Sequence, residues 1–167
     1  MLLISSMRER SMRQTLLLAL WASCLPMVHT HTFLALGLFS GGMVIGRLIV
    51  DTQDWNGILK RAAVYLGIVL VLALPQVLGA AVQQTIEGGS LRFQFNWVNN
   101  SGGRGMIDGY FWFWIKNAGL PFILMILAVL ESGRRGYLDI VMGMAGIFVI
   151  AETILFQPNE YDNNKLF

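Results

Sequence analysis

Residues Ala62–Val82 read AAVYLGIVLVLALPQVLGAAV, an uninterrupted run without a charged side chain. About 20 mostly apolar residues in a helix are enough to cross the hydrocarbon core of a bilayer. A helix also satisfies its own backbone hydrogen bonds there, which an isolated strand does not do. The run therefore predicts a membrane-spanning helix, with Pro75 in its outer part.

Four further apolar runs lie around this one. They are Gln14–Val28, Thr32–Val50, Tyr110–Leu130 and Tyr137–Phe156. The first is short, and Lys116, Asn117 and Pro121 interrupt the run that begins at Tyr110. The sequence thus predicts an all-α polytopic bundle with about five membrane helices, forming a single transmembrane domain over residues 1–167. Its one long loop, Gln83–Gly109, is expected on the extracytoplasmic side.

Composition points to the same class. Of the 167 residues, 55% are hydrophobic and only 13% are charged. Soluble domains carry about 25% charged residues, so this chain has too few charges to cover a soluble surface. A net charge of +2 without a basic patch gives no argument for nucleic acid, and we expect no such partner. The single cysteine, Cys24, excludes an intrachain disulfide.

The N-terminal segment permits two interpretations. Three arginines precede the first apolar run, which is the layout of a cleaved secretory signal. The stretch Leu20–Cys24 approaches a lipoprotein signal, but Trp21 stands where that signal has a small aliphatic residue. Because more apolar runs follow, an uncleaved first helix is favoured.

Lysine and arginine set the expected orientation, since cytoplasmic connections carry an excess of both. One set of alternate connections holds Arg8, Arg10, Arg13, Arg47, Lys60, Arg61, Arg134 and Arg135. The opposite set holds Arg92, Arg104, Lys116 and Lys165. The larger set predicts a multi-pass protein of the cell membrane with a cytoplasmic N-terminus. The long loop and the polar tail after Phe156 then lie outside.

Two histidines, His29 and His31, occupy the expected break between the first two helices. Imidazole there could serve as acid or base, bind a metal or hold a phosphate. Side chains two residues apart lie about 200° apart on a helix, so a shared metal requires a non-helical turn. The alternative is a polar loop that simply ends a helix.

The tail contains Glu160 and Asp162, two carboxylates with one residue between them. Hard cations such as Mg²⁺ and Mn²⁺ prefer oxygen ligands, so the pair could hold a divalent cation. An ordinary solvated tail has a similar composition, and that alternative stays open.

Glu152 lies in the outer part of the last apolar run. An ionisable side chain at such a depth is costly and is a functional candidate by default. It could instead extend to the interface or pair with Lys116. Gln76 is a weaker candidate of the same kind. In the long loop, Arg104 lies among glycines whose N–H groups could cradle a phosphate, although such loops are more often only flexible.

The stretches Leu25–Phe33, Phe111–Asn117 and Phe156–Lys165 together resemble the core of bacterial membrane proteins related to GT-C glycosyltransferases. The resemblance implies transfer of a sugar from a polyprenyl-phosphate carrier on the extracytoplasmic face, often with a divalent cation. It implies that Glu160 and Asp162 bind the cation or activate an acceptor, and that His29 and His31 hold the donor phosphate. Arg92, Arg104, Lys116 and Glu152 would bind substrate.

The chain departs from that family in two ways. The family's acidic motif normally follows the first membrane helix, and the family usually has about twice as many helices. We therefore expect a portion of a larger protein, in contact with membrane lipid and with its remaining helices or another membrane subunit. Two rival hypotheses are a transporter or flippase subunit, with helix breaks at Pro26, Pro75 and Pro121, and a non-catalytic membrane scaffold.

Overall fold

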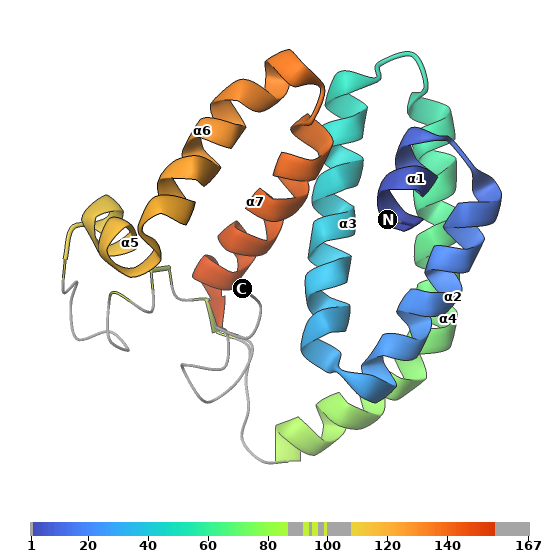
Figure 1. Ribbon diagram of the computed structural model, residues 1–167. Helices are drawn as coiled ribbons and strands as arrows, with labels where there is room; N and C mark the ends of the chain where they lie inside the picture. The colour runs from blue at the N-terminus through green and yellow to red at the C-terminus, as the bar shows by residue number, and fades with distance from the viewer. Residues whose placement is uncertain (1, 87–91, 94, 97–98, 100–107, 156–167) are drawn as a thin grey trace.

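The computed structural model describes residues 2–86, 92–93, 95–96, 99 and 108–155. The first half comprises α1 (Leu2–Arg8), α2 (Met12–Val28), α3 (Thr30–Val50) and α4 (Trp55–Ile86). The second half comprises α5 (Tyr110–Ala118), α6 (Leu120–Arg135) and α7 (Leu138–Thr153). Two short strands, β1 (Arg92–Phe93) and β2 (Ile154–Leu155), pair antiparallel beside the end of α7 (Figure 1). The predicted all-α class is confirmed.

Two helices are long and apolar enough to cross a membrane. They are α3 and the part of α4 from Trp55 to Gly79, and α5 with most of α6 provides a third if the bent pair counts as one span. Many large apolar side chains of α4 are exposed, among them Leu66, Leu70 and Val71. Lipid is the environment that such a surface requires, so the chain is a membrane protein. Since α2 and α7 have only 17 and 16 residues, the full count of five spans stays a prediction.

The helix breaks differ from those expected. Breaks at Pro26 and Pro75 are wrong, because α2 and α4 continue through both residues. The chain turns instead at Gly119, where φ is 57° and the axes of α5 and α6 differ by 115°. Glycine adopts this left-handed conformation without steric cost. Pro121 follows in the first turn of α6, where its missing N–H has no helical partner to lose.

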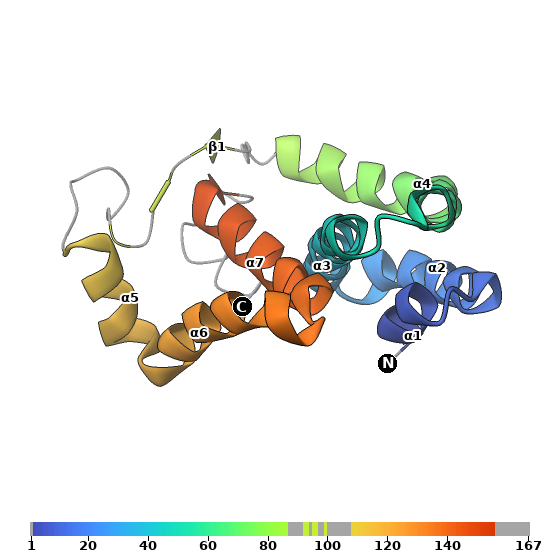
Figure 2. The same cartoon turned by 90° about the horizontal axis from the view of Figure 1, so that it is seen from above.

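A small apolar core joins the first three long helices. Its buried members come from α2, α3 and α4 and are Leu18, Ala19, Ala22, Met43, Tyr65, Val69 and Ala73. Gln76 adds a polar link, since its Nε2 donates to the Ser23 carbonyl of α2 at 3.1 Å. Seen from above, α3 lies between α7 on one side and α2 and α4 on the other (Figure 2).

The interface between α3 and α7 depends on glycine. A Cβ atom at Gly42 would lie 2.8 Å from the Gly143 Cα, and one at Gly46 would lie 2.5 Å from the Asp139 Cα. Close backbone approach at small residues is a common way for membrane helices to pack, because lipid supplies no hydrophobic driving force between them. Two glycine pairs in the sequence, Gly37 with Gly41 and Gly42 with Gly46, each spaced four residues apart, predict close helix packing. The structure confirms it at Gly42 and Gly46, whereas a Cβ at Gly37 or Gly41 would meet nothing within 4 Å.

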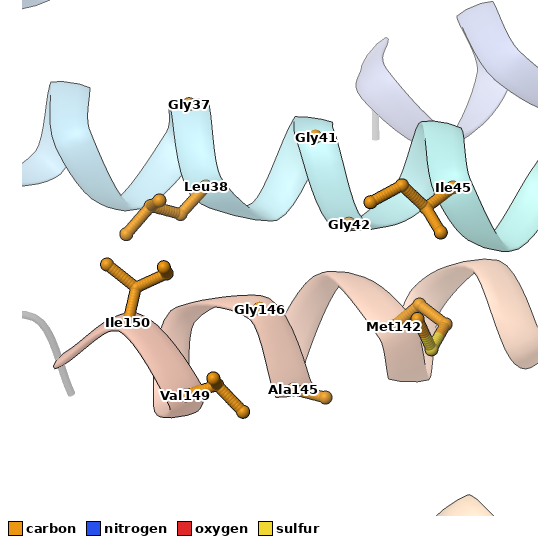
Figure 3. Close-up of a pocket in the computed structure, with 10 residues that line it drawn as sticks. All are labelled: Gly37, Leu38, Gly41, Gly42, Ile45, Met142, Ala145, Gly146, Val149 and Ile150. Atoms are coloured by element: carbon orange, nitrogen blue, oxygen red, sulfur yellow. The ribbon is translucent and has the colours of Figure 1, made fainter. Parts of the chain in front are cut away.

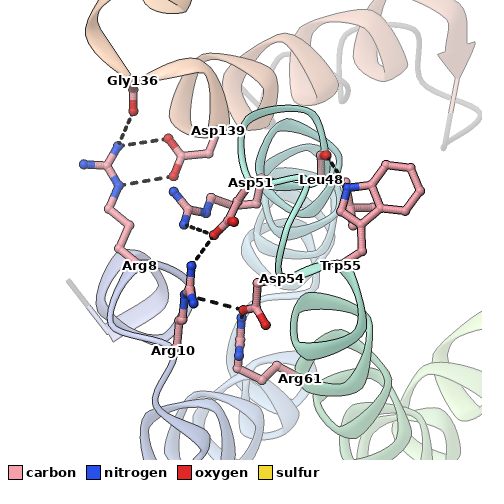
Figure 4. A network of polar contacts seen from close by, with 10 residues as sticks. Arg8, Arg10, Leu48, Asp51, Asp54, Trp55, Arg61, Gly136 and Asp139 are labelled. Atoms are coloured by element: carbon pink, nitrogen blue, oxygen red, sulfur yellow. Dashed lines mark hydrogen bonds and ion pairs between the residues drawn. The ribbon is translucent and has the colours of Figure 1, made fainter.

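Charged side chains that form ion pairs gather at the end of the bundle where α1, the α3–α4 turn and the start of α7 meet (Figure 4). We call them the arginine–aspartate cluster: Arg8, Arg10, Arg47, Asp51, Asp54, Arg61 and Asp139. Arg10 binds Asp51 at 2.7 Å, and Arg61 binds Asp54 at 3.0 Å. The hydrogen bond from Arg61 lowers the pKa of Asp54 from its ordinary value.

Asp51 and Asp54, which the sequence alone assigns to a solvated cytoplasmic loop, form ion pairs in the structure. Their side chains are 15% and 23% exposed and join arginines from three different segments. Four arginines of the larger predicted set, Arg8, Arg10, Arg47 and Arg61, thus meet at one end of the bundle. The cluster fastens that end, and its opposing charges nearly balance.

Arg8 forms the tightest contact between the N-terminal segment and α7. Its Nη2 lies 2.9 Å from one carboxylate oxygen of Asp139 and its Nε lies 3.2 Å from the other. Asp139 is 1% exposed, and it also accepts from the N–H of Ile140 at 2.9 Å. A carboxylate at the first turn of a helix is favoured by the helix dipole as well.

We expect Arg8→Ala to lower the free energy of unfolding by about 2 kcal/mol. The substitution leaves the buried Asp139 carboxylate without its cation, and the cost is below that of a fully buried pair because Arg8 is 31% exposed. Thermal unfolding in detergent measures the change. In a double-mutant cycle with Asp139→Asn, additive effects would show that the two residues do not interact.

Candidate functional site at the end of α7

The antiparallel register of α3 and α7 determines which residues share the other end of the bundle. Gly46 lies against Asp139, Gly42 against Met142, and Leu38 against Gly146. Continued in the same register, the start of α3 lies level with the last turn of α7. The two histidines and Glu152 are therefore at the same end, opposite the arginine–aspartate cluster.

Glu152 is the central residue of this end. Its side chain is 2% exposed, and neither carboxylate oxygen has a hydrogen-bond partner within the part of the chain that the structure describes. Burying a carboxylate without hydrogen-bond partners costs several kcal/mol, so such a group in a folded protein is a candidate for a functional role. Tyr110, at the start of α5, lies near enough to interact electrostatically with Glu152.

Asn96 lies over Glu152 from a different segment. The strand pair aligns Arg92 with Leu155, and three residues beyond Phe93 the N–H of Asn96 donates to the Glu152 carbonyl at 3.0 Å. Asn96 has φ of 56°, a left-handed conformation that asparagine tolerates better than most residues. It is 2% exposed, and its amide oxygen and nitrogen have no partner among the described residues. Two neighbouring buried side chains thus keep unused hydrogen-bonding capacity.

Lys116 does not pair with Glu152, so that alternative is wrong. Its Nζ lies 2.7 Å from an Asp108 carboxylate oxygen and 5.9 Å from the centre of the Trp112 ring. Asn99 holds Asp108 in place, because its amide donates to the Asp108 carbonyl and accepts from the Asp108 N–H. Lys116 is therefore engaged at the edge of the site, with 48% of its side chain exposed.

The histidines occupy the helix junction that the sequence predicted. The break falls at His29, which is extended and accepts a hydrogen bond from the Thr32 N–H at 3.2 Å through Nδ1. His29 thereby caps α3, which is the structural alternative that the sequence left open. The rings of His29 and His31 lie 5.5 Å apart. Across residues 2–86 and the described parts beyond them, no group of three or more metal-binding side chains forms.

Several predicted site residues are outside the description. Glu160, Asp162 and Arg104 lie outside the described residues, so their predicted roles, including the divalent cation at Glu160 and Asp162, stay predictions. Arg92 is described by its backbone in β1 but not by its side chain.

Sequence reasoning did not select Asn96 or Asp108, and it considered Asn99 only as part of the glycine-rich stretch around Arg104 and of a formal glycosylation sequon. Asp108 precedes the aromatic helix that contains Lys116, and an acidic residue before a lysine-bearing helix is a weak signal of an ion pair. Asn96 carries no signal, since its role depends on the strand pair that brings it to Glu152.

Comparison with known proteins adds no relative: no family model, no curated protein and no solved structure matches the chain.

Proposed function

We propose that this chain is part of a GT-C-like membrane glycosyltransferase, which uses a polyprenyl-phosphate-linked sugar at the end of the bundle where Glu152 lies. The observation that carries the proposal is the buried carboxylate of Glu152, with no hydrogen-bond partner among the described residues. A carboxylate in this state is ready to accept a hydrogen bond from a substrate hydroxyl. That bond to a charged group is stronger than one between neutral groups.

In the proposed reaction an acceptor hydroxyl oxygen forms a bond to the anomeric carbon of the sugar. The bond from that carbon to the phosphate oxygen breaks, and the polyprenyl phosphate leaves with the electron pair. The hydroxyl proton passes to a carboxylate of Glu160 or Asp162, the acidic pair that the resemblance implies. Glu152 orients the acceptor. The negative charge that develops on the leaving phosphate is stabilised by the side chains of His29, His31, Arg92 and Arg104.

Orientation is part of the proposal. The arginine–aspartate cluster would face the cytoplasm and the Glu152 end would face outward, because lysine and arginine are retained on the cytoplasmic side. The uninterrupted α2 and α4 favour an enzyme over a transporter, since transporters commonly build midplane sites from broken helices. The bent α5–α6 pair is the feature that a transporter would use.

The test is sugar transfer by the full-length protein in proteoliposomes, with a radiolabelled polyprenyl-phosphate-linked sugar as donor. We expect release of polyprenyl phosphate together with a labelled acceptor product. The double substitution Glu160→Ala and Asp162→Ala should reduce the rate by about 10²–10⁴-fold, the usual contribution of a general base. Unchanged transfer in that variant would remove the acidic pair from the reaction, and donor that is never consumed would refute the proposed function.

A further inference from the structure

An apolar groove runs between α3 and α7 (Figure 3). Its volume is about 420 Å³, and every side chain in its lining is apolar or absent. The lining residues are Gly37, Leu38, Gly41, Gly42, Ile45, Met142, Ala145, Gly146, Val149 and Ile150. Nothing polar in this lining binds a ligand, so an occupant would be held there by its apolar part.

The groove exists because α3 carries two glycine pairs with different surroundings. Gly42 and Gly46 touch the backbone of α7. A Cβ atom at Gly37 or Gly41 would meet nothing within 4 Å. Gly42 and Gly46 therefore bring the two helices together, whereas Gly37 and Gly41 leave the side of α3 open beside that contact.

Glu152 follows the last lining residues of the groove along α7. Ala145 and Val149 line the groove, and Glu152 follows at the spacing i, i+4, i+7, which places all three on one face of α7. At the end of that face the surroundings change from apolar to polar, with the unused hydrogen-bonding atoms of Glu152 and Asn96. A ligand that follows this face would be apolar along most of its length and polar at one end.

The chemistry of the polar end narrows the ligand. The carboxylate oxygens of Glu152 accept hydrogen bonds when ionised, and the protonated form also donates one, so a ligand hydroxyl, which does both, satisfies either form. No arginine or lysine whose side chain the structure describes pairs with Glu152, so a bare phosphate would meet no opposing charge from those residues. The amide of Asn96 both donates and accepts, which suits neighbouring hydroxyl groups. A second transmembrane helix would fill the groove but offer nothing to the carboxylate.

We propose that the groove and Glu152 together bind a hydroxylated single-chain lipid, with the chain along α3 and α7 and a head hydroxyl on the Glu152 carboxylate. The Asn96 side chain must move aside for the lipid to reach Glu152. This movement breaks no side-chain hydrogen bond among the described residues, because neither Asn96 nor Glu152 forms one. This inference rests on the proposed function in one respect, because it makes the hydroxylated lipid the acceptor.

Photo-crosslinking in nanodiscs of phosphatidylcholine tests the binding itself. The two probes are dodecyl maltoside and dodecylphosphocholine, each with a diazirine in the chain, and mass spectrometry maps the adducts. We expect the maltoside to label α3 and α7. Glu152→Gln should weaken that labelling about tenfold, because a hydrogen bond to a charged group is replaced by one to a neutral group. Dodecylphosphocholine, which has no hydroxyl, should label weakly and without dependence on Glu152.

Gly41→Leu should remove the labelling by covering the groove without touching α7. Gly67→Leu is the matched control, since a Cβ there also meets nothing within 4 Å but lies on α4, away from the groove. Ala145→Leu narrows the groove from the α7 side and provides a second test. Equal labelling by the two probes, or labelling that ignores Glu152→Gln or both groove variants, would overturn the inference.

The two proposals fail separately. Groove labelling that depends on Glu152 in a protein that transfers no sugar would refute the proposed function and keep the lipid site. Sugar transfer to an acceptor without any such labelling would refute the lipid site and keep the enzyme.

Discussion

Gly42→Leu is expected to separate α3 from α7 and to cost about 3 kcal/mol or more of stability. A Cβ at this position would overlap the Met142 carbonyl and lie 2.7 Å from its carbon. Those are backbone atoms inside a helix, so no side-chain rotation relieves the clash. Displacing α7 also disturbs both of its ends, the Asp139 ion pair and the Glu152 site.

The measurement is the thermal midpoint of the purified protein in detergent, together with the yield of folded protein. Gly41→Leu is the control, because its Cβ meets nothing within 4 Å on the same helix. Leucine has a higher helix propensity than glycine, so a loss in Gly42→Leu cannot come from the helix itself. Equal midpoints for the two variants would show that α3 and α7 do not pack through Gly42.

Glu152→Gln is expected to lower kcat/KM for the acceptor about 10-fold to 100-fold under the proposed function, which is the usual contribution of a hydrogen bond to a charged group. Glutamine keeps the size of the side chain but removes its charge. Because the carboxylate has no partner among the described residues, the substitution breaks no internal contact. Stability should therefore stay the same or rise, since the buried side chain can no longer ionise.

Steady-state transfer assays with varied acceptor separate this role from others. Glu131→Gln serves as the matched control, since Glu131 is an exposed carboxylate near the end of α6. A Glu152→Gln variant that loses stability and activity together would point to a structural role instead. An unchanged kcat/KM would remove Glu152 from acceptor binding.

The helices could be predicted from the sequence because apolar length is a local property. The run Ala62–Val82 lies wholly within α4, and the predicted break between helices falls at His29. The turn in the interrupted run was expected near Lys116 and Pro121. Its position at Gly119 depends on a left-handed backbone that the interruption alone does not specify.

Long-range pairing could not be predicted in the same way. Arg8 and Asp139 are 131 residues apart, and no periodicity connects them. The sequence did predict that Arg8 and Glu152 lie at opposite ends of the bundle, because consecutive membrane helices alternate in direction. The neighbours of Glu152 could not be predicted. The sequence suggested Lys116, whereas the structure brings Asn96 to Glu152 through a two-residue strand pair that has no sequence signal.

Sided cysteine labelling tests the central claim, which is that the Glu152 end of a membrane-crossing bundle faces outward and the arginine–aspartate cluster faces the cytoplasm. Thr30→Cys and Gln53→Cys place exposed thiols at the first residue of α3 and just beyond its last. Cys24 is exposed and is first replaced by serine. In intact cells a membrane-impermeant maleimide should label Thr30→Cys at once and Gln53→Cys only after permeabilisation. The reverse order, or equal labelling of both thiols in intact cells, would contradict the account.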